Sequence, residues 1–111
     1  MAEQIPLNSF KTEPRLLTTS ETLLYTTPLE RATIVLGSQA ANFSASPVTI
    51  TVTVRKNGQD FVLLKEYSIP PGDQLSVING KLILDYGCSI RAKVSSNNAV
   101  NIVLSILETT V

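Results

Sequence analysis

The side chains that could do chemistry are few in this sequence. Histidine, the most frequent general base and metal ligand, is absent from the 111 residues. Cys88 is the single cysteine, so an internal disulfide is excluded and a zinc site would need carboxylates alone. Serine nucleophiles lack a partner base. The sequence therefore predicts no enzyme, no cofactor and no catalytic residue.

Three aspartates lie in or beside expected turns: Asp60, Asp73 and Asp85. Aspartate in such positions commonly accepts hydrogen bonds from the local backbone, and this is the role we expect for all three. A calcium ion that bridges such loops is the alternative. The Gly72-Asp73 and Gly80-Lys81 pairs are turn residues rather than a phosphate loop, because neither opens a helix. No metal site is predicted.

Carbohydrate binding requires exposed aromatic rings that cover the apolar faces of sugars. The chain has no tryptophan. We expect each of the other aromatic side chains to pack in the core or to support a hairpin, so a lectin remains a minor hypothesis. These side chains are Phe10, Tyr25, Phe43, Phe61, Tyr67 and Tyr86.

The elements that would position any site are β-strands. Residues 48–55 alternate strictly between Val or Ile on one face and Thr or Arg on the other, as in a strand with one buried face. Asn57-Gly58 follows, and this pair favours a type I′ turn, in which both central residues have positive φ. Residues 61–67 then run back, so the pattern predicts a β-hairpin over residues 48–68.

The remaining segments also indicate strands. Asn79-Gly80 between two apolar runs predicts a second hairpin with the same turn chemistry. Residues 89–94 and 100–107 alternate, and Cys88 continues the inward face of the first of these, which predicts a buried, inert thiol. Eight or nine short strands without helical periodicity predict an all-β protein: an antiparallel two-sheet β-sandwich, jelly-roll or immunoglobulin-like, with the strand order left open.

The first fourteen residues differ from the rest of the chain. They show no consistent period, and Pro6 and Pro14 disfavour helix at the preceding residues. Ile5, Leu7 and Phe10 are too many apolar side chains for an ordinary frayed end. We therefore expect residues 1–14 to form an extended N-terminal arm that docks on its own domain or on a neighbour, and residues 15–111 to form the β-sandwich domain.

The chain is weakly charged, with a formal net charge of zero and 16% charged residues, against roughly 25% in an average soluble domain. There is no basic field to attract nucleic acid or anionic lipid, and no stretch resembles a signal peptide or a membrane span. Thr-rich strands explain such a surface, and so do neighbouring subunits that cover it; the two explanations are compatible.

Residues 64–73, 79–84 and 100–108, with Gly87, resemble small virion proteins of tailed phages. Residues 5–12 and 24–28 resemble those encoded by phages of cyanobacteria in particular. The resemblance implies a non-enzymatic virion structural protein, synthesised in the host cytoplasm, most simply a capsid decoration (cement) protein that stabilises the head. The alternatives are a head-tail, tail or baseplate accessory protein, or a host-surface binding module.

The same resemblance implies the partners. These are other virion proteins, either the major capsid protein or tail and neck proteins, with further copies of the chain in a homo-oligomer within the particle. Neither nucleic acid nor a membrane is an expected partner. In the arm, we expect Ile5, Leu7 and Phe10 to contact the partner, because an extended segment can pair with a neighbour's sheet while its side chains fill pockets.

Overall fold

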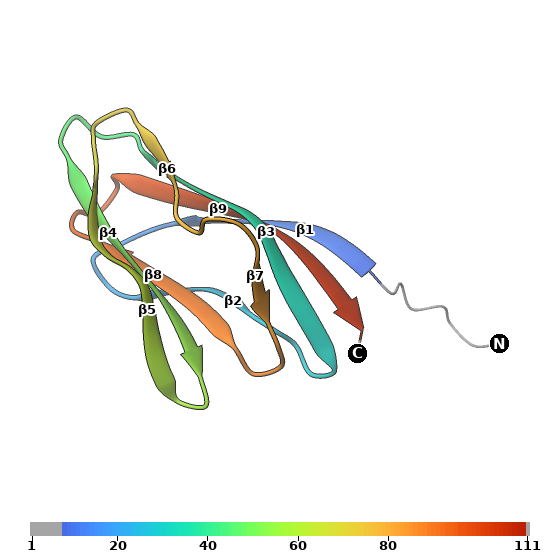
Figure 1. Ribbon diagram of the computed structural model, residues 1–111. Helices are drawn as coiled ribbons and strands as arrows, with labels where there is room; N and C mark the ends of the chain where they lie inside the picture. The colour runs from blue at the N-terminus through green and yellow to red at the C-terminus, as the bar shows by residue number, and fades with distance from the viewer. Residues whose placement is uncertain (1–7, 111) are drawn as a thin grey trace.

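The computed structural model describes residues 8–110, which form two antiparallel β-sheets packed face to face (Figure 1). No helix occurs in this range, and consequently none that is long and apolar enough to cross a membrane. The predicted antiparallel two-sheet β-sandwich is confirmed. The strands are β1 (Asn8–Leu16), β2 (Thr22–Thr26), β3 (Arg31–Asn42), β4 (Val48–Lys56), β5 (Gln59–Ile69), β6 (Gln74–Ser76), β7 (Leu82–Leu84), β8 (Ser89–Val94) and β9 (Val100–Thr110).

The two sheets have different membership. The five-stranded sheet has the order β1-β9-β3-β6, and β7 also pairs with β3. The four-stranded sheet has the order β2-β8-β4-β5. Because the chain crosses repeatedly between the sheets, strands that follow each other in sequence often lie in different layers (Figure 1).

The predicted hairpin over residues 48–68 is β4 and β5. Asn57 and Gly58 have φ values of 54° and 75°, as a type I′ turn requires. Val48, Ile50 and Val52 are buried on the inner face of β4, in agreement with the alternation of the sequence.

The predicted second hairpin around Asn79-Gly80 is wrong. The segments β6 and β7 do not pair with each other; each pairs antiparallel with β3, at Gln39–Ala41 and at Thr33–Val35. They are two pieces of one interrupted edge strand (Figure 1). Only Gly80 of the pair has a positive φ (79°), so the type I′ condition is not met. The interruption is held by Ser38, whose carbonyl and hydroxyl oxygens accept hydrogen bonds from the amides of Val77 and Ile78 at 3.2 and 2.9 Å.

The core fills the space between the sheets with aliphatic side chains from both. Cys88 lies among them, almost fully buried, so the predicted burial of the thiol is confirmed. Burial and a hydrogen bond from Sγ to the Asp85 carboxylate, at 2.9 Å, raise the pKa of the thiol. The largest fully buried side chains are Leu17, Leu24, Val35, Val48, Ile50, Val52, Ile69, Leu84, Ile90, Ile102, Leu104 and Ile106.

Part of the expected arm belongs to the sandwich. Residues 8–14 lie in β1, which pairs along its whole length with β9 of the same chain, from Asn8 opposite Thr109 to Leu16 opposite Asn101. The expected boundary at residue 15 therefore falls inside a strand. Residues 1–7, with Ile5 and Leu7, lie outside the described residues.

Candidate functional site

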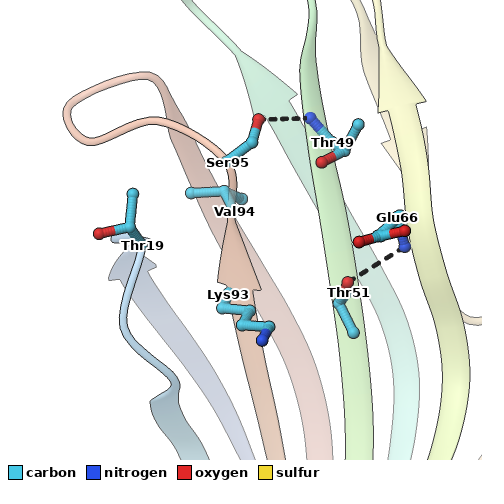
Figure 2. A pocket seen from close by; sticks show the side chains of 7 residues that line it. All are labelled: Thr19, Thr49, Thr51, Glu66, Lys93, Val94 and Ser95. Carbon is cyan, nitrogen blue, oxygen red and sulfur yellow. Dashed lines mark hydrogen bonds between the residues drawn. The ribbon is translucent and has the colours of Figure 1, made fainter.

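A polar hollow of about 270 Å³ lies on the outer face of the four-stranded sheet. The Thr49 amide donates a hydrogen bond to Ser95 Oγ at 3.0 Å, and the Glu66 amide donates one to Thr51 Oγ1 at 3.1 Å (Figure 2). Figure 2 shows the side chains spread along the strands rather than converging on one point. Two of the hydroxyls, those of Ser95 and Thr51, accept hydrogen bonds from the backbone, and the described residues that line the hollow include no aromatic ring. Its lining is Thr19, Thr49, Thr51, Glu66, Lys93, Val94 and Ser95.

The three turn aspartates do not come together. Asp73 accepts a hydrogen bond from the Gln74 amide at 2.8 Å, which confirms the expected backbone role for this residue. The other two form ion pairs instead: Asp60 with Arg55 at 2.6 Å and Asp85 with Lys56 at 2.9 Å. Across residues 8–110, no three His, Cys, Asp or Glu side chains group in a way that could hold a metal ion.

A buried electrostatic cluster is built around Glu108 of β9. Its buried carboxylate accepts hydrogen bonds from Lys11 Nζ of β1, at 3.2 Å, and from the Tyr25 hydroxyl of β2. Arg31 Nε of β3 lies 3.6 Å from its second oxygen. Because β1, β3 and β9 belong to one sheet and β2 to the other, Glu108 ties the two layers together.

The pKa values of Glu108 and Tyr25 reflect this contact. Burial alone would raise the pKa of Glu108, but hydrogen bonds from Tyr25 and Lys11 and the charges of Lys11 and Arg31 outweigh it and lower the pKa. Burial, together with the hydrogen bond to Glu108, raises the pKa of Tyr25 to about 12. The Glu108 carboxylate is thus held ionised and the Tyr25 phenol neutral. A neutral donor that binds an ionised acceptor in this way serves a structural role.

A second hollow, of about 510 Å³, lies between β5 and the interrupted edge strand β6–β7. Leu63 and Tyr67 of β5 lie on one side of it, and both are exposed. Seven of the ten described residues that line it have aliphatic or aromatic side chains, and none of the ten is an Asp, Glu, His or Cys. This groove is suited to holding an apolar segment rather than to chemistry. Its lining is Leu63, Leu64, Tyr67, Leu75, Ser76, Val77, Ile78, Asn79, Lys81 and Leu82.

The expectation that the aromatic side chains pack in the core or support a hairpin is wrong for Phe10, Phe43 and Tyr86, whereas Phe61 and Tyr67 lie on β5 of the β4–β5 hairpin. Tyr25 is half-buried, as expected, but the other five are 50–75% exposed. Phe10, Phe61 and Tyr67 are exposed because β1 and β5 are edge strands, whose side chains the facing sheet covers incompletely. Phe43 and Tyr86 are exposed because they lie outside the strands, after β3 and between β7 and β8. The exposed rings are Phe10, Phe43, Phe61, Tyr67 and Tyr86.

Of the residues predicted to contact a partner, the structure describes one. Phe10 lies on β1 opposite Leu107 of β9 and is 75% exposed. The roles of Ile5, Leu7 and Phe10 in partner binding stay predictions. The exposure of Ile83 and Leu36 gave no signal in the sequence, because a short apolar run is equally typical of a buried strand.

The fold defines the class of structures to which this chain is similar, the two-sheet β-sandwiches. No protein-family model and no curated protein sequence matches it. Among solved structures, it is similar to a protein of the disulfide-linked pili of Bacillus endospore appendages. That match has a TM-score of 0.57 and 9% sequence identity, and it covers 94% of this chain and 87% of the other.

Two further structures are similar. One comes from the viral particle of infectious bursal disease virus, with a TM-score of 0.56 and 8% identity; it covers 99% of this chain, which spans 32% of that one. The other is the nucleoplasmin-like N-terminal domain of Drosophila FKBP39, with a TM-score of 0.51 and 12% identity over 95% of this chain and 93% of that one. At these identities the likeness shows the fold alone.

Proposed function

We propose that this protein is a non-enzymatic structural component of a virion and acts by assembly. One observation carries the proposal: twelve large apolar side chains of residues 8–110 are 39–75% exposed. Scattered exposed apolar residues are normal, but a domain of this size with so many of them is suited to being covered by other subunits. The sandwich fold, similar to proteins from a viral particle and from a pilus, supports this reading.

Within the virion, we propose a capsid decoration (cement) protein that binds the major capsid protein and stabilises the head. The short neutral chain supports this, since repeated copies on a symmetric shell need only a weak contact each. The resemblance of the sequence to virion proteins of tailed phages supports it too. A place at the head-tail junction, tail or baseplate is the alternative within the same class.

Two proposals, the virion component and the capsid decoration protein, are tested by labelling the protein on purified particles and locating the label by electron cryomicroscopy. We expect copies distributed over the head, and we expect particles that lack the protein to lose their genome at lower temperature. Copies confined to the neck or baseplate would overturn the decoration role but keep the virion role. Absence from purified particles would overturn both.

The arm is tested separately, by deleting residues 2–7. This deletion leaves β1 intact, since β1 begins at Asn8. We expect the truncated protein to fold as the full chain does and to bind particles more weakly, because Ile5 and Leu7 are lost. Equal binding by the two proteins would show that residues 2–7 have no part in docking. Phe10→Ser in the full chain is the companion variant, because it removes the third predicted contact.

A host-surface binding module is the second candidate, and the exposed aromatic rings favour it. Phe61 and Tyr67 of β5 and Phe43 are 50–55% exposed, and exposed rings are what stacking on an apolar sugar face requires. Screening the purified protein against a glycan array discriminates the two functions. Binding that is abolished by Tyr67→Ser supports the module, and an array without binding supports the assembly role.

A further inference from the structure

The edge strand β1 directs its side chains in an unexpected way. Directly opposed residues of an antiparallel pair lie on the same face of the sheet. Lys11, Glu13 and Arg15 are opposite Ile106, Leu104 and Ile102, whose side chains are buried between the sheets. The charges of β1 therefore lie on the inward side, where Lys11 binds Glu108 and Arg15 pairs with Glu13. The alternate side chains, Phe10 and Pro14 among them, face outward.

The same outward face continues over β9, β3, β6 and β7, and within these paired strands it carries no charged residue. The register places every Asp, Glu, Lys and Arg of these strands on the other face. We call this surface the charge-free face. It consists of Asn8, Phe10, Thr12, Pro14 and Leu16 of β1; Asn101, Val103, Ser105, Leu107 and Thr109 of β9; Ala32, Ile34, Gly37, Gln39 and Ala41 of β3; Gln74 and Ser76 of β6; and Ile83 of β7.

An apolar row crosses the charge-free face. Phe10 is opposite Leu107, Leu107 is opposite Ile34, and Ile34 is opposite Ile83, so the row spans four strands. Opposed side chains of neighbouring strands are about 5 Å apart, which makes the row continuous. Its ends are open to water, with Phe10 75% and Ile83 69% exposed.

The outer face of the four-stranded sheet is built differently. Thr49, Thr51 and Arg55 of β4 lie beside Arg91 and Lys93 of β8, as the register and burial of these strands show. This is the polar outer face that an antiparallel sheet normally presents to water. Charged side chains therefore lie on the outer face of the four-stranded sheet but not on the charge-free face.

We propose that the charge-free face packs against the same face of a second copy, as an isologous dimer. Two such faces bury no ionised group, so neither copy bears the cost of an unpaired charge. A partner with a charged surface would find no complementary group here. This proposal does not depend on where in a virion the protein is located.

The size of the face is sufficient for such a contact. The strands β1, β9, β3, β6 and β7 have 9, 11, 12, 3 and 3 residues, 38 in all. At about 3.3 Å per residue and about 4.8 Å between strands, they give about 600 Å² per copy and about 1,200 Å² for the pair. A specific interface buries at least about 1,000 Å² in total, so the contact lies at the lower end of that range. Two sheets can also stack face to face at about 10 Å, which lets the apolar rows interdigitate. We expect a dimer of micromolar affinity.

Sedimentation equilibrium of the full-length protein, from about 1 to about 100 µM, tests the proposal. We expect a monomer–dimer equilibrium without larger species, since an isologous contact closes on itself. Ile83→Lys should weaken dimerisation about tenfold or more, because each dimer would bury two new ammonium groups. Phe10→Lys, at the other end of the row, should do the same.

Val62→Lys is the matched control. Val62 is 58% exposed, lies on β5 of the other sheet and is opposite Thr53. It should leave the dimer unchanged, and circular dichroism should show that all three variants fold. A wild-type monomer over the whole range overturns the proposal, even if the charge-free face proves to bind a different protein. Equal weakening by Val62→Lys and Ile83→Lys, or open-ended oligomers, overturns it as well.

Discussion

The two edges of the sandwich, where the outermost strands of the two sheets face each other, differ in their contacts. At the β1/β2 edge, Glu108 of β9 binds Lys11 and Arg31 of its own sheet and the Tyr25 hydroxyl of the other sheet. At the opposite edge, β5 faces the interrupted strand β6–β7, and an apolar groove remains open. The β1/β2 edge thus contributes to stability, whereas the edge at β5 and β6–β7 leaves apolar surface available for contact.

The largest expected difference concerns a buried leucine at the first edge. Leu24 of β2 is fully buried, so Leu24→Ala should lower the free energy of unfolding by about 3 kcal/mol through lost burial and the cavity left behind. Leu63 of β5 is 41% exposed, and Leu63→Ala should cost about 0.5–1 kcal/mol. Urea unfolding followed by circular dichroism measures both. Equal losses would show that the groove edge is as tightly packed as the other.

A smaller difference is expected between two carboxylates. Glu108→Ala should cost about 2 kcal/mol, since it leaves the Tyr25 hydroxyl and two cations without their acceptor. Glu21 provides the control, because it too lies near two cations, Arg55 at 3.5 Å and Arg91 at 3.7 Å, but is exposed. Glu21→Ala should cost about 0.5 kcal/mol or less. A loss from Glu21→Ala as large as that from Glu108→Ala would contradict the structural role assigned to burial.

Glu108 should also make the stability of the β1/β2 edge depend on pH. The pKa of Glu108 is lowered in the fold, so its contribution is present above pH 4.5, the ordinary value for the carboxyl, and is lost as the pH falls through the folded value. Glu108→Gln should therefore unfold with a shallower dependence on pH below 4.5 than the wild type. The pKa values of Asp60 and Asp85 are also lowered, and they make stability depend on pH in the same way in the wild type and in Glu108→Gln. Their contributions therefore cancel when the two proteins are compared.

At alkaline pH, stability should fall as the pH rises, which is the opposite dependence to that of Glu108. The pKa of Tyr25 is raised to about 12, so its contribution is present below pH 10 and is lost as the pH rises toward 12. Tyr25→Phe should lose less stability than the wild type over this interval. A phenolate that titrates near 10 in a spectrophotometric titration of the folded protein would contradict the contact with Glu108.

Sequence patterns predicted the β4–β5 hairpin because its alternation and its Asn57-Gly58 turn are local. They failed for β6 and β7, because Asn79-Gly80 carries the same local signal while the pairing partner is the distant strand β3. For β1 they predicted an arm that docks on its own domain or on a neighbour, but no pattern indicated that Lys11 faces inward and Phe10 outward. On an edge strand, polarity alone does not tell which face is covered, and the Glu108 cluster depends on residues brought together from four strands.

At the groove, a small effect on stability is expected together with a larger effect on binding. Leu63→Ser should change the free energy of unfolding by about 1 kcal/mol or less, because Leu63 is largely solvated already. It should nevertheless reduce the binding of an apolar fluorescent dye, because Leu63 lines the groove. Val62→Ser is the control: Val62 is the preceding residue of β5, similarly exposed, and does not line the groove. If both variants reduce dye fluorescence equally, the dye reports general surface hydrophobicity. If only Leu63→Ser does so, the second edge binds apolar groups without contributing much to the stability of the fold, which is the division of roles that the two edges suggest.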